Sequence, residues 1–403
     1  MDHVAQTTET PLRIVHYSPG VRLELGGVVR AVLDWCIVLA ARGHDVTLVT
    51  FDSPDIPYDW NGQPGKPKVV FPPEAYWPNF LVPQKTVRVW RDILADGGGV
   101  AHLHTPWTAS NLQMAHAARK LEIPYVVSIH GMLDDWAMLQ RGWKKRMFLQ
   151  MGGRKYLCAA DRLHFTAAAE QMQARKWVNE SNAVVLPYLV DLAPFQPLPG
   201  KQIAQARFPV LAGPEPKLLF LSRLHEKKGV DLLIEAAGIL RGKGMKFKLI
   251  IVGSGSPDYQ ALLTRLTQRL NLTDVVKFLG LVTGVEKISL YQAADIFILP
   301  THQENFGLVL IEALAAGTPV VTTRGTDIWQ DIAAAGGSVI GNSPDVLAAE
   351  LQRLLENRES LPALGERGRQ WVLENLNTET LARGYEKMYA GMLKQSPSAV
   401  ARR

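Results

Sequence analysis

Short apolar runs rich in β-branched residues alternate with amphipathic segments along almost the whole chain. In the first half these runs cover residues 12–17, 45–50, 100–104, 124–129 and 183–187. In the second half they cover residues 217–222, 246–253, 275–280, 295–300 and 319–323. Because apolar runs separated by helices are typical of parallel sheets buried on both faces, we predict an α/β protein with two doubly wound sheets.

A proline-rich stretch separates the two halves. Residues 191–216 contain six prolines, a density typical of an extended, semi-rigid connection. We therefore expect an N-terminal Rossmann-like domain over residues 1–190, a linker over 191–216 and a second Rossmann-like domain over 217–377. Ligands of doubly wound sheets bind beyond the carboxyl ends of the strands, so the two domains would face a central cleft and each supply one wall.

Composition narrows the class of protein. The 403 residues are 47% hydrophobic and 20% charged, which is ordinary for a soluble chain of two or three domains. Two distant cysteines fit a reducing compartment, the polar first residues do not fit a secretory signal, and no apolar run approaches the ~18 residues of a spanning helix. The net charge is +6, but the sequence contains neither a zinc finger nor a concentrated basic stripe. We therefore expect a cytoplasmic protein with no nucleic-acid partner.

The segment HQENFGLVLIEALAAGTPVV (302–321) follows a predicted strand, and its helix is expected to begin at Asn305 or Phe306. A helix N-terminus offers unpaired N–H groups and a positive dipole end, which suit a diphosphate. Glu304 and Glu312 would lie about 10 Å apart along the helix axis, too far for an acid/base pair but close to the span of a sugar nucleotide. The alternative is a structural role for both glutamates, one in the acidic first turn of the helix and the other at the edge of the core. Gly307 and the position of the segment after a strand make this alternative less favourable.

Two further loops follow strands of the second half. Arg223 and Lys228 flank one of them, where two cations would clamp a diphosphate and stabilise the charge of a leaving group. Gly253, in IVGSGSP, would let the backbone approach a ligand closely. Taken singly, a solvated basic turn and a tight glycine turn are the more frequent explanations of such patterns.

The first half offers weaker candidates. Gly26 and Gly27 open a helix after the first strand, without a GxGxxG fingerprint, and suit close approach to a phosphate or sugar. His130 follows a strand, which predicts an imidazole at the cleft mouth, and a structural role is equally open. His104 has a similar position close to Trp107 and would face an acceptor, although a structural role is favoured.

Residues 141–157 combine basic side chains with aromatic and aliphatic ones. A basic amphipathic helix of this kind can lie on anionic lipid, although a domain helix with a solvated face is the favoured explanation. The chain has no DxD sequence to hold a metal–diphosphate complex. We therefore expect neither a metal ion nor a cofactor, with Arg223 and Lys228 stabilising the leaving group.

Taken together, these residues resemble the GT-B retaining glycosyltransferases of family 4 (glycosyltransferase group 1), and SIHGML resembles subgroups that build bacterial polysaccharides. The likeness covers nearly the whole chain and is carried by SRLHEKKG, IVGSG, VKFLG, ADIFILPTHQENFGLVLIEALAAGTPVV and TTRGTD, in the family's order. It implies transfer of a hexose from a UDP- or GDP-sugar to a saccharide or lipid-linked saccharide, with retention at the anomeric carbon, in cell-surface polysaccharide biosynthesis. It also implies that a last helix, residues 378–394, crosses back to the N-terminal domain.

The resemblance assigns roles to individual residues. Glu304 would contact the donor sugar and Glu312 the ribose, while His130 would lie beside the reacting sugar. The implied catalytic residues are Arg223, Lys228, Glu304 and His130. The implied donor-binding residues are Gly26, Gly27, Gly253, Leu281, Asn305, Phe306, Gly307, Leu308 and Glu312.

Two segments depart from the family pattern. Tyr188-Leu189 stands where the family usually has Asn-Gly, and TRGTDIWQD (323–331) replaces a GG-x-x-E pattern. No residue stands out as a nucleophile, so we expect front-face attack, in which the leaving phosphate accepts the proton of the acceptor. Two alternatives remain: a sugar-nucleotide 2-epimerase, which would need further carboxylates in the cleft, and a catalytically silent homologue that serves as a partner subunit.

Overall fold

The computed structural model describes residues 10–23, 26–52, 54–73, 81–179 and 181–395. Contacts divide the chain into two compact units: unit 1 comprises residues 1–191 and 378–403, and unit 2 comprises residues 192–377. The polar first residues, from which we predicted that there is no secretory signal, lie largely outside the described part. Among the described helices none has the length and apolar character needed to cross a membrane.

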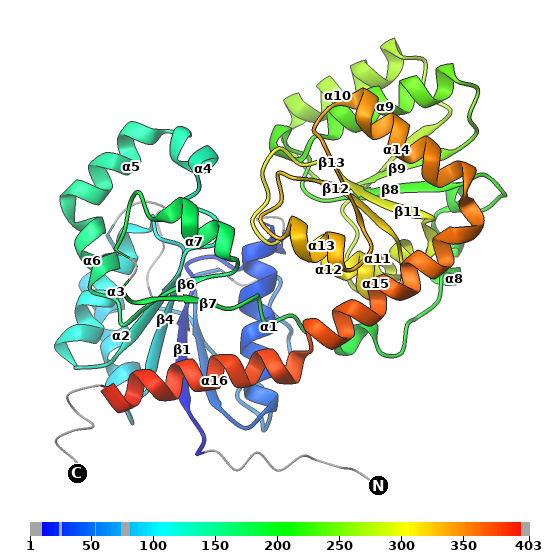
Figure 1. The fold of residues 1–403 in the computed structure, drawn as a ribbon. Coiled ribbons are helices and arrows are strands. Elements are labelled where there is room, and N and C mark those ends of the chain that lie inside the picture. Colours follow the sequence, from blue (N-terminus) through cyan, green and yellow to red (C-terminus); the bar gives the residue numbers. More distant parts are fainter. Residues whose placement is uncertain (1–9, 24–25, 53, 74–80, 180, 396–403) are drawn as a thin grey trace, which may run out of the picture. The chain divides into compact units, whose positions relative to one another are not determined.

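In the described part of unit 1, seven parallel strands form one sheet in the order β3-β2-β1-β4-β5-β6-β7 (Figure 1). The strands are β1 (Arg13–Tyr17), β2 (Asp45–Val49), β3 (Lys68–Val70), β4 (Val100–His104), β5 (Tyr125–Ser128), β6 (Arg162–Phe165) and β7 (Ala183–Val185). The strand order reverses between β1 and β4, which is the place where doubly wound sheets bind ligands. The register there sets His16 of β1 opposite His102 of β4.

The helices of unit 1 cover the sheet (Figure 1). They are α1 (Gly27–Ala41), α2 (Gln84–Ala95), α3 (Ala109–Lys120), α4 (Asp135–Leu139), α5 (Gly142–Phe148), the π-helical turn η2 (Leu149–Gly153), α6 (Arg154–Cys158), α7 (Ala168–Ala174) and α16 (Thr378–Gln395). The last helix belongs to unit 1 although it follows unit 2 in sequence. Its buried Glu386 accepts hydrogen bonds from Arg42 Nε at 2.6 Å and pairs with His44 Nε2 at 2.8 Å.

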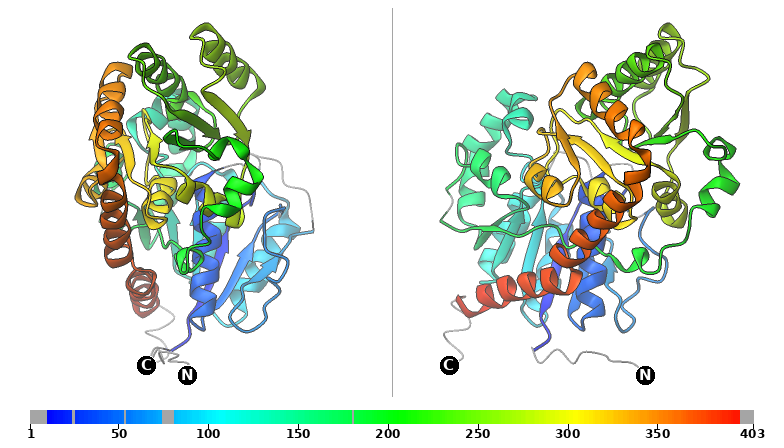
Figure 2. Two further views of the ribbon diagram at one scale, coloured as in Figure 1. Left: turned by 90° about the vertical axis from the view of Figure 1, so that its right-hand side faces the viewer. Right: turned by 45° about the vertical axis from the view of Figure 1, so that its right-hand side comes forward.

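In the described part of unit 2, six parallel strands form a second sheet in the order β10-β9-β8-β11-β12-β13. They are β8 (Lys217–Leu221), β9 (Lys248–Val252), β10 (Val276–Gly280), β11 (Ile296–Leu299), β12 (Val320–Thr323) and β13 (Ser338–Ile340). The turned views show helices on both faces of this sheet (Figure 2). The two doubly wound sheets that the hydrophobic pattern predicts are therefore confirmed.

The longer helices of unit 2 are α8 (Gln202–Arg207), α9 (Val230–Gly242), α10 (Pro257–Arg269), α11 (Gly284–Ala293), α12 (Leu308–Ala315), α13 (Trp329–Ala334), α14 (Pro344–Glu356) and α15 (Leu361–Asn375). Short 3-10 turns are η3 (Ala193–Phe195), η4 (Pro209–Leu211), η5 (Glu226–Lys228) and η6 (Arg358–Ser360).

The proline-rich segment differs from the extended linker that we expected. It packs on α11 of unit 2, where the backbone N–H of Ala204 donates to Ser289 Oγ at 2.8 Å and Ser289 Oγ donates to the carbonyl of Gly200 at 2.6 Å. Two of its prolines open η3 and η4 instead of extending the chain. Proline suits the first positions of a helix, and two of the six prolines mark short helix starts here.

Candidate functional site

The loops at the carboxyl ends of β8 and β11 bring two of the predicted residues together. Lys228 ends η5, and its Nζ forms an ion pair with Glu304, which follows β11. Lys228 is 7% exposed. The backbone N–H of Glu304 donates to the carbonyl of Gly325 at 2.7 Å, and its carbonyl accepts from the N–H of Asp327 at 2.9 Å. The loop after β12 thus holds Glu304 in a strand-like position beside Lys228.

The electrostatics of this loop cluster favour an anionic Glu304. Burial alone would raise the pKa of Glu304, but the charge of Lys228 and its hydrogen bond outweigh burial and lower that pKa. The charges of Lys227 and Arg223 act in the same direction. Arg223 is exposed, so its guanidinium is accessible to a ligand while Lys228 is held by Glu304.

Two glycines bring the backbones of these loops into contact. Gly253 follows β9 with φ 138°, and a Cβ there would lie 1.9 Å from the carbonyl oxygen of Ser222. Gly229 has φ 66°, and a Cβ there would lie 2.1 Å from the carbonyl oxygen of Pro300. Both positions therefore require glycine for the approach of neighbouring loops, and a ligand contact at Gly253 stays a prediction.

Helix α12 begins at Leu308, later than the predicted start at Asn305 or Phe306. The reason is Gly307, which takes a left-handed conformation (φ 66°, ψ 55°) and ends the preceding turn. Asn305 and Phe306 are buried in that turn. Because Glu304 lies outside the helix, the rise per residue of a helix does not give its separation from Glu312.

Glu312 is held by two side chains of α11 that the sequence analysis missed. Lys287 Nζ donates to Glu312 Oε1 at 2.6 Å, and the Tyr291 hydroxyl donates to Glu312 Oε2 at 2.8 Å. Glu312 is 5% exposed. Lys287 and Tyr291 are four apart and share one face of α11, but the sequence does not show that this face meets Glu312. Leu281, which follows β10 of unit 2, is 55% exposed, so its side chain is accessible to a ligand.

In unit 1, the predicted glycine pair marks the beginning of α1. Gly26 is the N-cap residue with φ 104°, and the helix starts at Gly27. The expectation of a helix start at this position is confirmed, and the approach of a phosphate or sugar to the pair remains a prediction.

We expected the imidazole of His130 at the mouth of a cleft, but in the structure the ring is buried. His130 is 6% exposed, its Nδ1 lies 2.6 Å from the Tyr188 hydroxyl, and its Nε2 lies 3.1 Å from His104 Nδ1. His104, expected to face an acceptor, is 0% exposed. Left-handed backbone at His130 (φ 57°) and Gly131 (φ 71°) turns the chain at the end of β5, and the ring points into the unit.

The sequence analysis also missed a buried histidine cluster in unit 1. Its members surround the buried ring of Trp35 and are His16, His102, His104, His130 and His164. Burial lowers the pKa of His16 to about 3 and that of His164 to about 4. Burial first, and then neighbouring histidines, hold the pKa values of the other three well below the usual value. All five rings are therefore neutral at pH 7.

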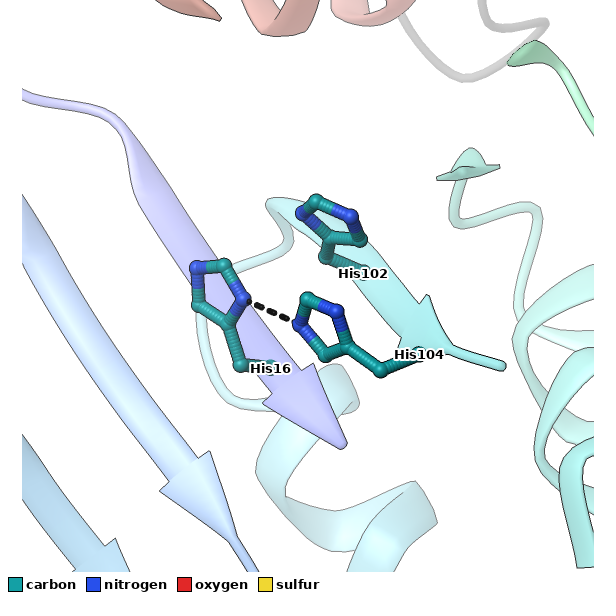
Figure 3. A group of neighbouring side chains, drawn as sticks. All are labelled: His16, His102 and His104. Atoms are coloured by element: carbon teal, nitrogen blue, oxygen red, sulfur yellow. Dashed lines mark hydrogen bonds between the residues drawn. The ribbon is translucent and has the colours of Figure 1, made fainter. Parts of the chain in front are cut away.

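Three of these rings come close enough to raise the question of a metal ion. Within the described residues, His16, His102 and His104 bring one ring nitrogen each to within 4.8 Å of the others (Figure 3). A metal ion lies in the plane of each imidazole that binds it. The rings of His102 and His104 are stacked at 4.3 Å with 24° between their planes, so their lone pairs do not converge. The arrangement fits hydrogen bonding rather than a shared ion.

Comparison with known proteins identifies the family to which the chain belongs. Residues 202–371 match the family described as "Glycosyl transferases group 1", and residues 26–188 match "Glycosyl transferase 4-like domain". The chain belongs to the group 1 glycosyl transferases, as the resemblance predicted. Two Rossmann-like sheets with flanking helices define the two-domain α/β GT-B fold of that family.

Curated relatives share part of the chain. The D-inositol 3-phosphate glycosyltransferase of Kineococcus radiotolerans is 32% identical over 271 residues, which cover 62% of this chain and 62% of that protein. A GDP-mannose-dependent alpha-(1-6)-phosphatidylinositol monomannoside mannosyltransferase of Mycobacterium tuberculosis is 32% identical over 206 residues, 49% of this chain and 53% of that protein. The chain thus spans about 50–60% of the length of these relatives.

Solved structures share the fold over nearly the whole chain. Sucrose-phosphate synthase from Thermosynechococcus elongatus superposes with a TM-score of 0.78 at 23% identity, covering 96% of this chain and 100% of that one. The Anabaena protein HepE in complex with UDP and glucose superposes with a TM-score of 0.77 at 17% identity, covering 94% and 100%. At these identities the likeness concerns the fold alone.

Proposed function

We propose that the protein transfers a hexose from a UDP- or GDP-sugar to a saccharide or lipid-linked saccharide. The observation that carries this proposal is the Lys228–Glu304 pair beside exposed Arg223 at the carboxyl edge of the sheet of unit 2. A fixed carboxylate next to two cations suits a ligand that has hydroxyl groups at one end and a diphosphate next to them. Membership of the group 1 family supports the same reaction.

Each end of the donor has a matching group in this proposal. The diphosphate would bind Arg223 and Lys228, whose charges stabilise it as it leaves. The ribose hydroxyls would bind the Glu312 carboxylate, which Lys287 and Tyr291 hold in place. Arg223 and Lys228 would neutralise the leaving diphosphate in place of a divalent metal ion, so transfer would be independent of metal.

The stereochemical outcome would be retention. Among the described residues of unit 2, the carboxylates at the site are engaged: Glu304 with Lys228 and Glu312 with Lys287. Neither suits a nucleophile, which supports front-face attack with the leaving phosphate as proton acceptor.

The acceptor would reach the protein from a membrane surface. Residues 141–157 contain no acidic side chain, and they include basic Lys144, Arg146 and Arg154. Apolar side chains are exposed on the same segment: Trp143 is 66% and Met151 76% exposed. Exposed apolar and basic groups together suit anionic lipid, and a lipid-linked acceptor in cell-surface polysaccharide biosynthesis would then be presented at the inner face of the membrane.

The test of the reaction is release of nucleoside diphosphate from UDP-glucose, UDP-galactose and GDP-mannose in the presence of chelator. Glu304→Gln removes the charge at constant size and should lower turnover at least about a hundredfold, since it alters a group in contact with the reacting sugar. Lys243→Met, on the exposed side of unit 2, is the control and should leave turnover unchanged. Equal turnover in Glu304→Gln and wild type would refute the site. The anomeric configuration of the product, read by NMR, tests retention.

The membrane contact has its own test. Flotation with vesicles of phosphatidylglycerol should carry the protein at low salt, and replacement of Lys144 and Arg146 by glutamine should reduce this binding. Binding that is absent, or that does not respond to salt or to the substitutions, would contradict it.

A further inference from the structure

A pair of glycines interrupts the helical segment between α5 and α6 of unit 1 (Figure 1). Gly152 of η2 has φ 127° and ψ −13°, a conformation that residues with a side chain rarely adopt. A Cβ at Gly153 would lie 2.5 Å from the ring of Phe148, so that ring packs directly on the backbone of η2. Both positions therefore require glycine. Short π-helical turns of this kind occur frequently at functional sites.

A cavity opens beside this π-helical turn. Its volume is about 660 Å³, within the range of roughly 300–1,000 Å³ that is usual for small-molecule sites. The residues that line it belong to η2 and α6, and they include Met151, Arg154, Lys155 and Cys158. We call it the η2 cavity. Its lining comes from one continuous segment of unit 1, so the site is complete within that unit.

The charged groups of the η2 cavity are both cations. Arg154 and Lys155 are exposed, and among the residues that the structure describes no acidic side chain pairs with either of them. The whole segment 141–157 contains six basic residues and no acidic one. A helix face that is merely solvated commonly mixes charges of both signs. The cavity thus suits an anion, and a phosphate group accepts hydrogen bonds from a guanidinium and an ammonium together.

An exposed apolar stripe leads into the same cavity. Trp143 and Met147 of α5 and Met151 of η2 follow one another at intervals of four residues, and all three are exposed. Residues four apart lie on one side of a helix. Met151 also lines the η2 cavity, so the apolar stripe and the two cations meet there. A ligand that joins a phosphate to hydrocarbon chains matches both features, whereas a free phosphate ion would leave the stripe in water.

We propose that the η2 cavity binds the phosphodiester group of an anionic phospholipid of the membrane. Arg154 and Lys155 hold the phosphate oxygens, while the apolar stripe enters the acyl layer beside it. The apolar face of an interfacial helix lies about 5–10 Å deep at the boundary of headgroups and acyl chains, so cations next to it are at the level of the phosphates. A phosphate bound at one end of the stripe fixes the direction of α5 on the membrane. This inference rests on the membrane contact of the proposed function, to which it adds a defined lipid site.

Cys158 is a natural reporter inside the cavity. It is exposed, whereas Cys36, the other cysteine of the chain, is buried. Neutral N-ethylmaleimide should therefore modify Cys158 first, and mass spectrometry of the peptide that contains it gives the rate. A ligand in the η2 cavity covers the thiol and slows this reaction. The probe is dihexanoyl phosphatidylglycerol, a short-chain lipid that dissolves as monomers, added to the full chain in the absence of any sugar donor.

Two double variants lose the same charge at different places. Arg154→Gln with Lys155→Gln neutralises the cations that line the cavity, and Lys144→Gln with Arg146→Gln neutralises two cations of the same segment outside the lining. The lipid concentration that halves the modification rate is determined within each protein, so a change in the reactivity of the thiol itself cancels. This concentration should rise about tenfold in the first variant and stay within about twofold of wild type in the second. Equal shifts in the two variants would overturn the proposal, because they would indicate a general attraction of charge.

Inorganic phosphate separates the two sources of the anion. At the lipid concentration that halves the rate, inorganic phosphate should leave the modification of Cys158 unchanged. Equal protection by both would indicate a site for free anions only and would overturn the assignment to a lipid. No protection by the lipid would refute the site altogether.

Failure of this inference is distinguishable from failure of the proposed function. Flotation with vesicles but without protection of Cys158 would refute the η2 cavity as a lipid site and leave the membrane contact in place. If wild type releases no nucleotide from any donor tested, the proposed transfer fails. Protection of Cys158 is measured without a donor, so it still decides whether the cavity binds lipid.

Discussion

Replacing His16 by phenylalanine should destabilise unit 1 at pH 7.5 and stabilise it at pH 5.0. His16 is 0% exposed, and burial lowers its pKa from 6.5 to about 3. In the unfolded chain the ring takes up a proton as the pH falls below 6.5, whereas the folded protein does not until near pH 3. The neutral ring thus contributes stability above pH 6.5 that is lost progressively between pH 6.5 and 3.

The size of the effect follows from that difference in pKa. Between pH 7.5 and pH 5.0, proton uptake by the unfolded His16 favours unfolding by about 2 kcal/mol. The hydrogen bond from His16 to His104, lost in the variant at either pH, contributes about 1 kcal/mol. The variant should therefore be about 1 kcal/mol less stable than wild type at pH 7.5 and about 1 kcal/mol more stable at pH 5.0.

Two carboxyl groups of unit 1 change the folding stability with pH in the opposite direction to His16. Burial raises the pKa values of Asp34 and Glu170 to about 7, so their folded forms gain protons as the pH falls and add stability there. These contributions are present in wild type and variant alike. The difference between the two proteins therefore isolates His16.

The assay is urea unfolding at pH 7.5 and pH 5.0, read by pulsed hydrogen exchange on peptides from β1 and β4 so that unit 2 does not contribute. Val15→Ala, in the same strand and equally buried, removes no titrating group and should cost the same at both pH values. A stability difference between His16→Phe and wild type that stays constant from pH 7.5 to pH 5.0 would refute the reasoning.

Three further substitutions test other contacts. Lys287→Met removes the cation that holds Glu312 and should raise the donor KM about tenfold with kcat largely kept, as measured by steady-state kinetics; an unchanged KM would contradict the role of Lys287. Gly253→Ala places a Cβ 1.9 Å from a backbone carbonyl and should lower the Tm of unit 2 by about 5 °C in calorimetry; an unchanged Tm would show that the loops have room to move. Arg42→Met leaves buried Glu386 without its guanidinium partner and should destabilise unit 1 by about 3 kcal/mol in urea, with faster proteolysis of α16; wild-type stability would contradict this pairing.

Most of the fold could be predicted from the sequence because buried parallel strands are continuous apolar runs. Three strands were not predicted, and each lacks a continuous apolar run. β3 and β13 have three residues each and are partly exposed at sheet edges, so they carry little apolar pattern. β6 is central, but Arg162 and His164 interrupt its run. The boundary of α12 was wrong because the left-handed Gly307 delays the helix, which helical periodicity does not reveal.

The candidate site was predictable where it lies in loops after strands. Lys228 and Glu304 are brought together by two strands of the same sheet that end at the same edge. Lys287 and the histidine cluster were missed for another reason: they lie within a helix and within strands. Their meeting depends on the packing of neighbouring helices and on the register that sets His16 opposite His102, and a single sequence gives neither.

The most direct test of the central claim is calorimetric titration of the full chain with UDP, GDP and their glucose and mannose conjugates. The account predicts that one nucleotide series binds without added metal, that Lys228→Met weakens binding about tenfold to a hundredfold, and that Lys243→Met leaves it unchanged. Binding of equal strength to wild type and Lys228→Met, or no binding of any of these ligands, would contradict it.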